Sequence, residues 1–108
     1  MLVESNNNKA LEIARRNDIA RKLSLGVMVT KKAADLPDLE GLLSTVRVYN
    51  NFTVKNDPYE AHDMGDFNWK GEKVIWKIDY YDPTLTCCVD PLDPDCKRII
   101  TVMLASEY

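Results

Sequence analysis

The chain has 108 residues, a net charge of −3, 45% hydrophobic residues and 29% charged residues. These values are typical of a soluble globular protein with one core, because the chain is too short to bury two. No run approaches the roughly 18 apolar residues that a membrane-spanning helix needs, and the first residues lack the apolar stretch of a secretory signal. We therefore expect a cytoplasmic protein that does not engage a membrane.

Charge is distributed unevenly along the chain. Residues 1–55 hold nine Lys/Arg against six Asp/Glu, whereas residues 56–95 hold three against ten, a balance of −7. An acidic segment of this size disfavours nucleic acid as a direct ligand and favours a basic protein surface or a cation. An ordinary solvated acidic face would explain the same distribution.

The three cysteines, Cys87, Cys88 and Cys96, all fall within ten residues. A disulfide framework would need an even and dispersed set. We expect three reduced thiols in a loop of a cytosolic protein, and the alternative is a zinc site that these residues form with His62.

The first predicted helix covers residues 6–24. Residues 1–8, which overlap its first turn, are expected to form a flexible N-terminus. The Asn run can cap this helix, and its inward side carries small and apolar residues at helical spacing, with one amide: Ala10, Ile13, Ala14, Asn17 and Ala20. The basic residues occupy the other sides and should be exposed: Arg15, Arg16, Arg21 and Lys22. Gly26 ends the helix, and residues 27–29 begin a short strand.

The second predicted helix covers residues 35–50. Pro37 suits its first turn, and the core-facing stripe is Leu39, Leu42, Leu43, Val46 and Asn50. The Asn-Asp-Pro sequence at residues 56–58 ends any periodicity.

Two predicted strands follow and form a hairpin with its turn at Gly71-Glu72. One face of the second strand is strongly apolar and carries Val74, Trp76, Ile78 and Tyr80. Residues 82–98 contain three Asp-Pro steps and are predicted to form a loop. The last apolar run, residues 99–105, hardly alternates, so we expect a central strand covered on both faces.

The predicted order is helix, strand, helix, strand, strand, strand, in one domain over residues 1–108. This order indicates an α+β fold with two helices packed on one face of a mostly antiparallel four-stranded sheet.

Several stretches together resemble one family. These are RRNDIARK, the pattern NDPY–HD–G–F, the block WKIDYYD, the Asp-Pro loop and the terminal TVMLASEY. The same stretches occur in the same order in the DUF3768 family of uncharacterised proteins. The resemblance implies a small bacterial protein associated with mobile elements, and it supplies no catalytic assignment. Members usually carry GEHDFG, whereas this chain has Glu60, Ala61 and Met64 in place of the Gly, the Glu and the Phe.

His62 is the single histidine and has two interpretations. It could act as a metal ligand or a general base assisted by Asp63, Asp79 and Asp82. It could equally bridge the loop to the sheet by one hydrogen bond, while Asp57 caps the local backbone. The chain has no second histidine and no HExxH motif, so the structural interpretation is favoured.

Aromatic residues beside acidic loops suggest a contact surface. The candidate partner-binding residues are Asp57, Tyr59, Glu60, Asp63, Asp66, Trp69, Tyr81 and Asp82. We expect a non-enzymatic interaction protein, without a cofactor or resident metal, that binds a host protein with a basic surface. An inhibitor of a nucleic-acid-binding defence complex, of the anti-CRISPR or anti-restriction type, fits this composition. The alternative is a small metal-assisted hydrolase centred on His62, with Asp63 and Asp79.

Overall fold

The computed structural model describes the backbone of residues 2–108 and the side chains of residues 8–108. Its elements are α1 (Leu2–Lys22), β1 (Val27–Val29), α2 (Lys31–Ala34), α3 (Leu39–Val48), β2 (Met64–Trp69), β3 (Glu72–Tyr81), β4 (Lys97–Leu104) and the 3₁₀ turn η1 (Ala105–Glu107). Within these residues, no helix combines the length and the hydrophobicity that crossing a membrane requires. The predicted α+β fold is confirmed.

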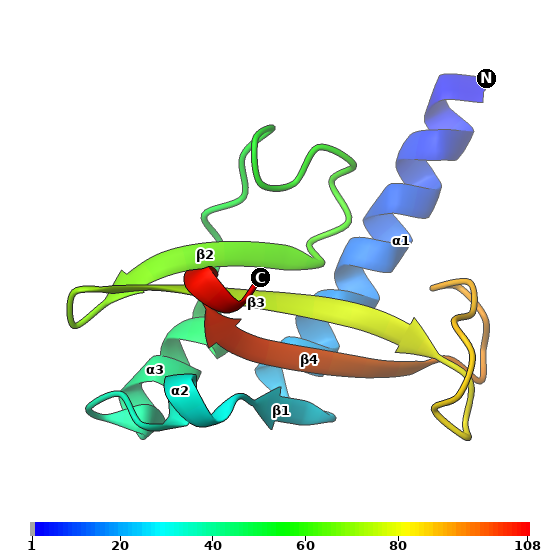
Figure 1. Ribbon diagram of the computed structural model, residues 1–108. Coiled ribbons are helices and arrows are strands. Elements are labelled where there is room, and N and C mark those ends of the chain that lie inside the picture. Colours follow the sequence, from blue (N-terminus) through cyan, green and yellow to red (C-terminus); the bar gives the residue numbers. More distant parts are fainter. Residues whose placement is uncertain (1) are drawn as a thin grey trace.

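The four strands form one sheet in the order β1-β4-β3-β2. The pair β1 and β4 is parallel, whereas β3 is antiparallel to both of its neighbours. The C-terminal strand β4 is therefore central, as its apolar sequence predicts. Helices α1 and α3 lie behind the sheet in Figure 1, and η1 lies in front of it.

The core lies between the sheet and these helices. Trp76 is fully buried at its centre, and the strand register places it opposite Gly65 of β2 and Val102 of β4. From α3, Leu42 and Val46 come one helical turn apart and close the core from the other side. The remaining members of the buried cluster are Tyr49, Val74, Ile78 and Ile100.

Helix α1 differs from its prediction in two respects. It begins at Leu2, so the Asn run lies inside the helix and does not cap it. Arg21 is only 2% exposed, although it was assigned to the outer side. The reason is helical spacing: Arg21 stands four residues after Asn17 and seven after Ala14, on the same buried stripe. The flexibility of residues 1–8 stays a prediction, and residue 1 lies outside the described part.

Three smaller predictions were also wrong. The hairpin turn is Lys70-Gly71, and both residues have positive φ angles, 50° and 87°, which a tight two-residue turn requires. The helix predicted over residues 35–50 corresponds to the shorter α3, Leu39–Val48, and α2 is a separate short helix that precedes the predicted range. At the end of α3 Asn50 is exposed and Tyr49 is buried, because the helix stops at Val48 and the chain turns.

The opposite face of the sheet carries no helix over the described residues except the short η1. Ile99 and Thr101 of β4 point to this face and are half-buried, whereas Met103 is buried near η1. The expectation that β4 is covered on both faces therefore holds only at the η1 end.

Gly65→Ala should destabilise the protein by about 2–3 kcal/mol, the usual range for overpacking a tight core. An added Cβ would lie 2.6 Å from Trp76 Nε1 and 2.6 Å from Tyr49 Cε1. Gly71→Ala is the matched control, because a Cβ at this position would meet nothing within 4 Å. Only the positive φ angle of Gly71 disfavours alanine there, and this should cost about 1 kcal/mol of stability. Urea unfolding of both variants measures the difference, and equal losses would contradict this account of Gly65.

Candidate functional site: a buried polar cluster and an acidic loop

His62 lies between two carboxylates and stacks on an aromatic ring. Its Nδ1 lies 3.1 Å from Asp18 Oδ1 of α1, and its Nε2 lies 3.8 Å from Asp57 Oδ2. The imidazole is parallel to the Phe52 ring, with 3.9 Å between centroids. Because a carboxylate only accepts hydrogen bonds, Nδ1 carries the proton toward Asp18. His62 therefore joins the loop over residues 50–63 to helix α1.

Asp18 also holds the buried Arg21. The Arg21 Nη2 atom lies 3.2 Å from Asp18 Oδ1 and donates to the Tyr49 carbonyl at 2.8 Å. The guanidinium lies 4.8 Å from the centroid of the Trp76 ring, a cation–π contact inside the core. Burial lowers the pKa of the Arg21 guanidinium, against the opposing influence of Asp18. Its Nε and Nη1 have no acceptor among the described residues.

Asn17, the residue directly before Asp18 in α1, connects three segments. Its Nδ2 donates to the Ala61 carbonyl at 2.9 Å and to the Tyr80 hydroxyl at 2.8 Å, and its Oδ1 accepts from Arg98 of β4. The Tyr80 hydroxyl in turn donates to Asp63 Oδ2 at 3.3 Å. Burial raises the pKa of the Asp63 carboxyl and that of the Tyr80 hydroxyl.

Asp57 is 5% exposed and serves the backbone of its own loop. Its Oδ1 accepts from the N–H groups of Ala61 and His62, at 3.0 and 3.1 Å. These bonds hold a stretch in which Glu60 and His62 have positive φ angles of 58° and 55°. Asp57 is therefore buried and holds the loop, although it was assigned to the contact surface.

The alternative catalytic residues do not converge. His62 pairs with Asp18 and Asp57, which lie on opposite sides of its ring, whereas Asp63 is held by Tyr80. Asp79 pairs with Lys77, and both precede Tyr80 at positions that point to the other face of β3. Among residues 2–108, no three His, Cys, Asp or Glu side chains are placed to hold a metal. The structure therefore pairs His62 with Asp18 and Asp57, whereas Asp63 and Asp79 have other partners.

The other candidate contact residues are dispersed over the molecule. Tyr59 is 84% exposed beside the exposed Glu60, in the loop drawn at the top of Figure 1. Asp66 pairs with Lys73 at 3.1 Å. Trp69 is half-buried, packs against the core and donates to the Pro37 carbonyl at 2.8 Å, so its side chain is held in place by the fold. Tyr81 and Asp82 lie at the far end of β3, so these residues do not form one surface.

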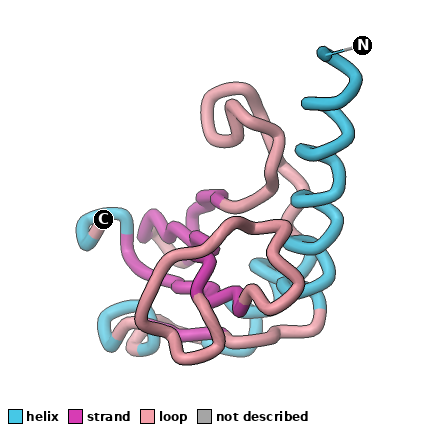
Figure 2. The backbone as a smooth tube through the Cα atoms, turned by 90° about the vertical axis from the view of Figure 1, so that its right-hand side faces the viewer, coloured by secondary structure: helices cyan, strands magenta, loops and turns pink. Residues whose placement is uncertain are grey.

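The loop over residues 82–96, here called the acidic loop, is a charged segment of which the sequence analysis selected only Asp82 for the contact surface. It contains Asp82, Asp90, Asp93 and Asp95 and no Lys or Arg, and it faces the viewer in Figure 2. The three Asp-Pro steps were the available signal, but they were interpreted only as loop formers.

Side-chain hydrogen bonds fix the acidic loop. Asp82 Oδ1 accepts from the Thr86 N–H at 3.0 Å, which with the other bonds to Thr84 and Thr86 lowers the pKa of Asp82. Asp90 and Asp93 accept from backbone N–H groups two residues ahead, both at 2.8 Å. From behind, Arg16 and Arg98 donate to the carbonyls of Leu92 and Pro91. The aspartates are therefore presented by an ordered backbone.

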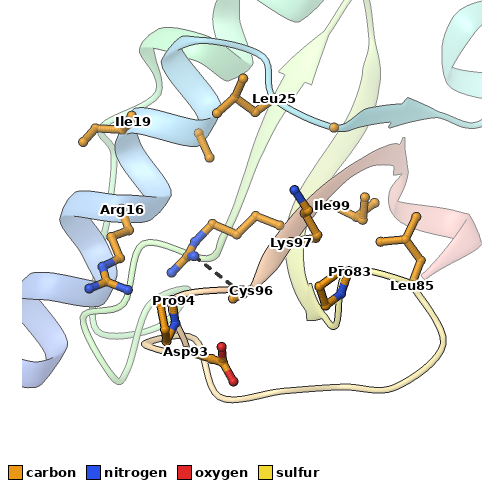
Figure 3. A pocket seen from close by; sticks show the side chains of 13 residues that line it. Arg16, Ile19, Leu25, Pro83, Leu85, Asp93, Pro94, Cys96, Lys97 and Ile99 are labelled. Carbon is orange, nitrogen blue, oxygen red and sulfur yellow. Dashed lines mark hydrogen bonds between the residues drawn. The ribbon is translucent and has the colours of Figure 1, made fainter.

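A hollow of ≈ 660 Å³ separates the acidic loop from helix α1 (Figure 3). Apolar side chains from both sides line it: Ile19, Leu25, Pro83, Leu85, Pro94 and Ile99. Cys96 lies at its edge, 3.6 Å from Arg98 Nη1, and burial raises the pKa of its thiol. All three cysteines are free, as the sequence analysis predicts.

The fold and the cluster define a small α+β domain whose long helix is tied to a loop and a sheet by buried polar side chains. Three of the stretches that resemble a family, RRNDIARK, NDPYEAHD and WKIDYYD, supply this cluster. The sequence model of that family, described as a protein of unknown function (DUF3768), matches residues 14–107. The chain belongs to the DUF3768 family. Comparison with curated proteins and with solved structures gave no match.

Asp57→Ala should destabilise the fold by about 2–3 kcal/mol, because the buried N–H of Ala61 and the half-buried N–H of His62 lose a charged acceptor. Asp57→Asn is the matched control, since its amide oxygen can still accept from Ala61 and His62. Guanidinium unfolding compares the two, and a loss as large for Asn as for Ala would show that the negative charge matters more than these bonds.

Asp63→Asn should change how stability depends on pH. The folded pKa of Asp63 lies above its unfolded value, so the folded state binds the proton more tightly and stability falls as pH rises through that window. The variant lacks this loss and should gain stability relative to the wild type as the pH rises above about 4, the ordinary pKa of an aspartate. Thermal melts across this range measure the gap, and a gap independent of pH would contradict the assignment.

Proposed function

We propose that this protein is a non-enzymatic interaction protein that binds a basic protein surface through its acidic loop. One observation carries the proposal: four aspartates lie on one loop without a single Lys or Arg, and hydrogen bonds order that loop. Charge that is fixed in place steers a complementary partner and loses little conformational entropy on binding.

The proposed target is a nucleic-acid-binding defence complex of a bacterial host, of the CRISPR or restriction type. Such complexes carry basic channels for phosphates, and a row of carboxylates can compete for the same surface. A mobile element would gain from carrying this activity, and the protein would act in the cytoplasm of the host. The net charge of −3 and the −7 balance of residues 56–95 also favour attraction between this protein and a basic surface.

The binding test is a pull-down from host lysate with the purified protein, at low and at raised salt. Wild-type protein should retain a basic protein that is released as salt screens the contact. The variant Asp90→Asn/Asp93→Asn/Asp95→Asn should lose it, although its amide oxygens can keep the loop turns. The control Asp35→Asn/Glu40→Gln/Glu72→Gln changes the net charge equally at exposed positions elsewhere and should bind as wild type.

The target class is tested by plasmid transformation into a strain with an active CRISPR or restriction system. Expression of the wild type should raise the yield at least tenfold, and the acidic-loop variant should not. Equal yields with and without the protein would contradict the proposed defence target. If the pull-down retains no protein even at low salt, the interaction proposal as a whole is wrong.

A further inference from the structure

The face of the sheet opposite the helices carries a patch of apolar side chains around two charges. The strand register places Met28, Thr101, Lys77 and Met64 in one row across all four strands. Ile99 and Asp79 form the neighbouring row on β4 and β3. We call these residues, with Tyr81 and Leu85, the open face, and Figure 1 views the sheet from this side.

The open face is more apolar than a solvated sheet surface requires. Met28 is 61% exposed and Leu85 is 52% exposed. A hollow of ≈ 400 Å³ lies between them, lined also by Tyr81, Ile99 and Thr101. An antiparallel sheet with one face in water usually alternates apolar with polar residues. The run from Ile99 to Met103 scarcely does so, and among the helices of the described chain η1 is the one in front of this side of the sheet (Figure 1).

The charges at the centre of the open face are balanced, unlike those of the protein as a whole. Lys77 and Asp79 are two residues apart on β3 and form an ion pair, so the centre of the patch is neutral while the chain carries −3. In a two-fold contact each cation can meet the other copy's anion. A strongly basic or acidic partner would find no net charge to complement at this centre, although the register places Lys97 beside Tyr81 at the edge of the same face.

We propose that the open face is the contact surface of a homodimer, in which a second copy of this chain covers Met28, Leu85 and Ile99. Lys77 then lies against Asp79 of the partner subunit, and the two ion pairs form a ring of four alternating charges. Homodimer interfaces are the more apolar class of protein contact, which matches the patch. Because the patch is small, the dimer dissociates on dilution.

Sedimentation equilibrium of the purified full chain from micromolar to millimolar concentration tests the proposal. Wild-type protein should shift from monomer to dimer across this range. Met28→Glu/Leu85→Glu should weaken dimerisation at least tenfold. Leu11→Glu/Val48→Glu is the matched control, because these side chains are 64% and 73% exposed on helices away from the open face, and it should dimerise as wild type.

A charge swap identifies the contact itself. Lys77→Glu and Asp79→Lys should each dimerise at least tenfold more weakly than wild type, since each copy then carries like charges on this face. A one-to-one mixture of the two should regain the wild-type dimer fraction. Monomeric wild type at millimolar concentration, equal effects of the test and control variants, or a mixture no better than its parts would each overturn the proposal. Circular dichroism confirms that every variant is folded.

Discussion

The contact between Asp18 and Arg21 is the constraint on which the rest of this structure depends. Arg21 is only 2% exposed, and its guanidinium lies against Trp76 in the core. The guanidinium pairs with the Asp18 carboxylate and donates to the Tyr49 carbonyl. Removing one partner of a buried ion pair commonly costs about 3–5 kcal/mol, because the other charge stays buried without compensation. The same carboxylate also binds His62, so helix position and loop conformation are fixed together.

The cluster around Asn17 and Asp18 accounts for most of what looked like chemistry in the sequence. The loop over residues 50–63 has no regular secondary structure, and its backbone groups are satisfied by side chains such as Asp57 and Asn56. His62 stacks on Phe52, its Nδ1 is bonded to Asp18, and its Nε2 lies 3.8 Å from Asp57. These contacts stabilise the fold, because they join helix α1, the loop over residues 50–63 and the sheet.

Much of the fold could be predicted from local patterns. The alternation of Val74, Trp76 and Ile78 indicates one buried strand face, and the run after Ile99 indicates the central strand; both follow from periods that need no distant partner. The site could not be predicted in this way. Asp18 and His62 are 44 positions apart, and nothing in either segment says that the two meet. Arg21 was predicted to be exposed because it is charged, although its helical position lies on the buried stripe. The cation–π contact with the Trp76 ring and the ion pair with Asp18 stabilise the buried charge.

The sequence by itself determined the fold class, the central strand, the acidic balance of residues 56–95 and the three free thiols, because composition and short periods decide these properties. Only the tertiary structure decided that Asp57 is buried, that Asp63 and Asp79 lie apart from His62, and that the acidic loop forms one ordered surface. The physical reason is that burial and side-chain pairing depend on which segments the folded chain brings together, and that is set by packing across the whole domain.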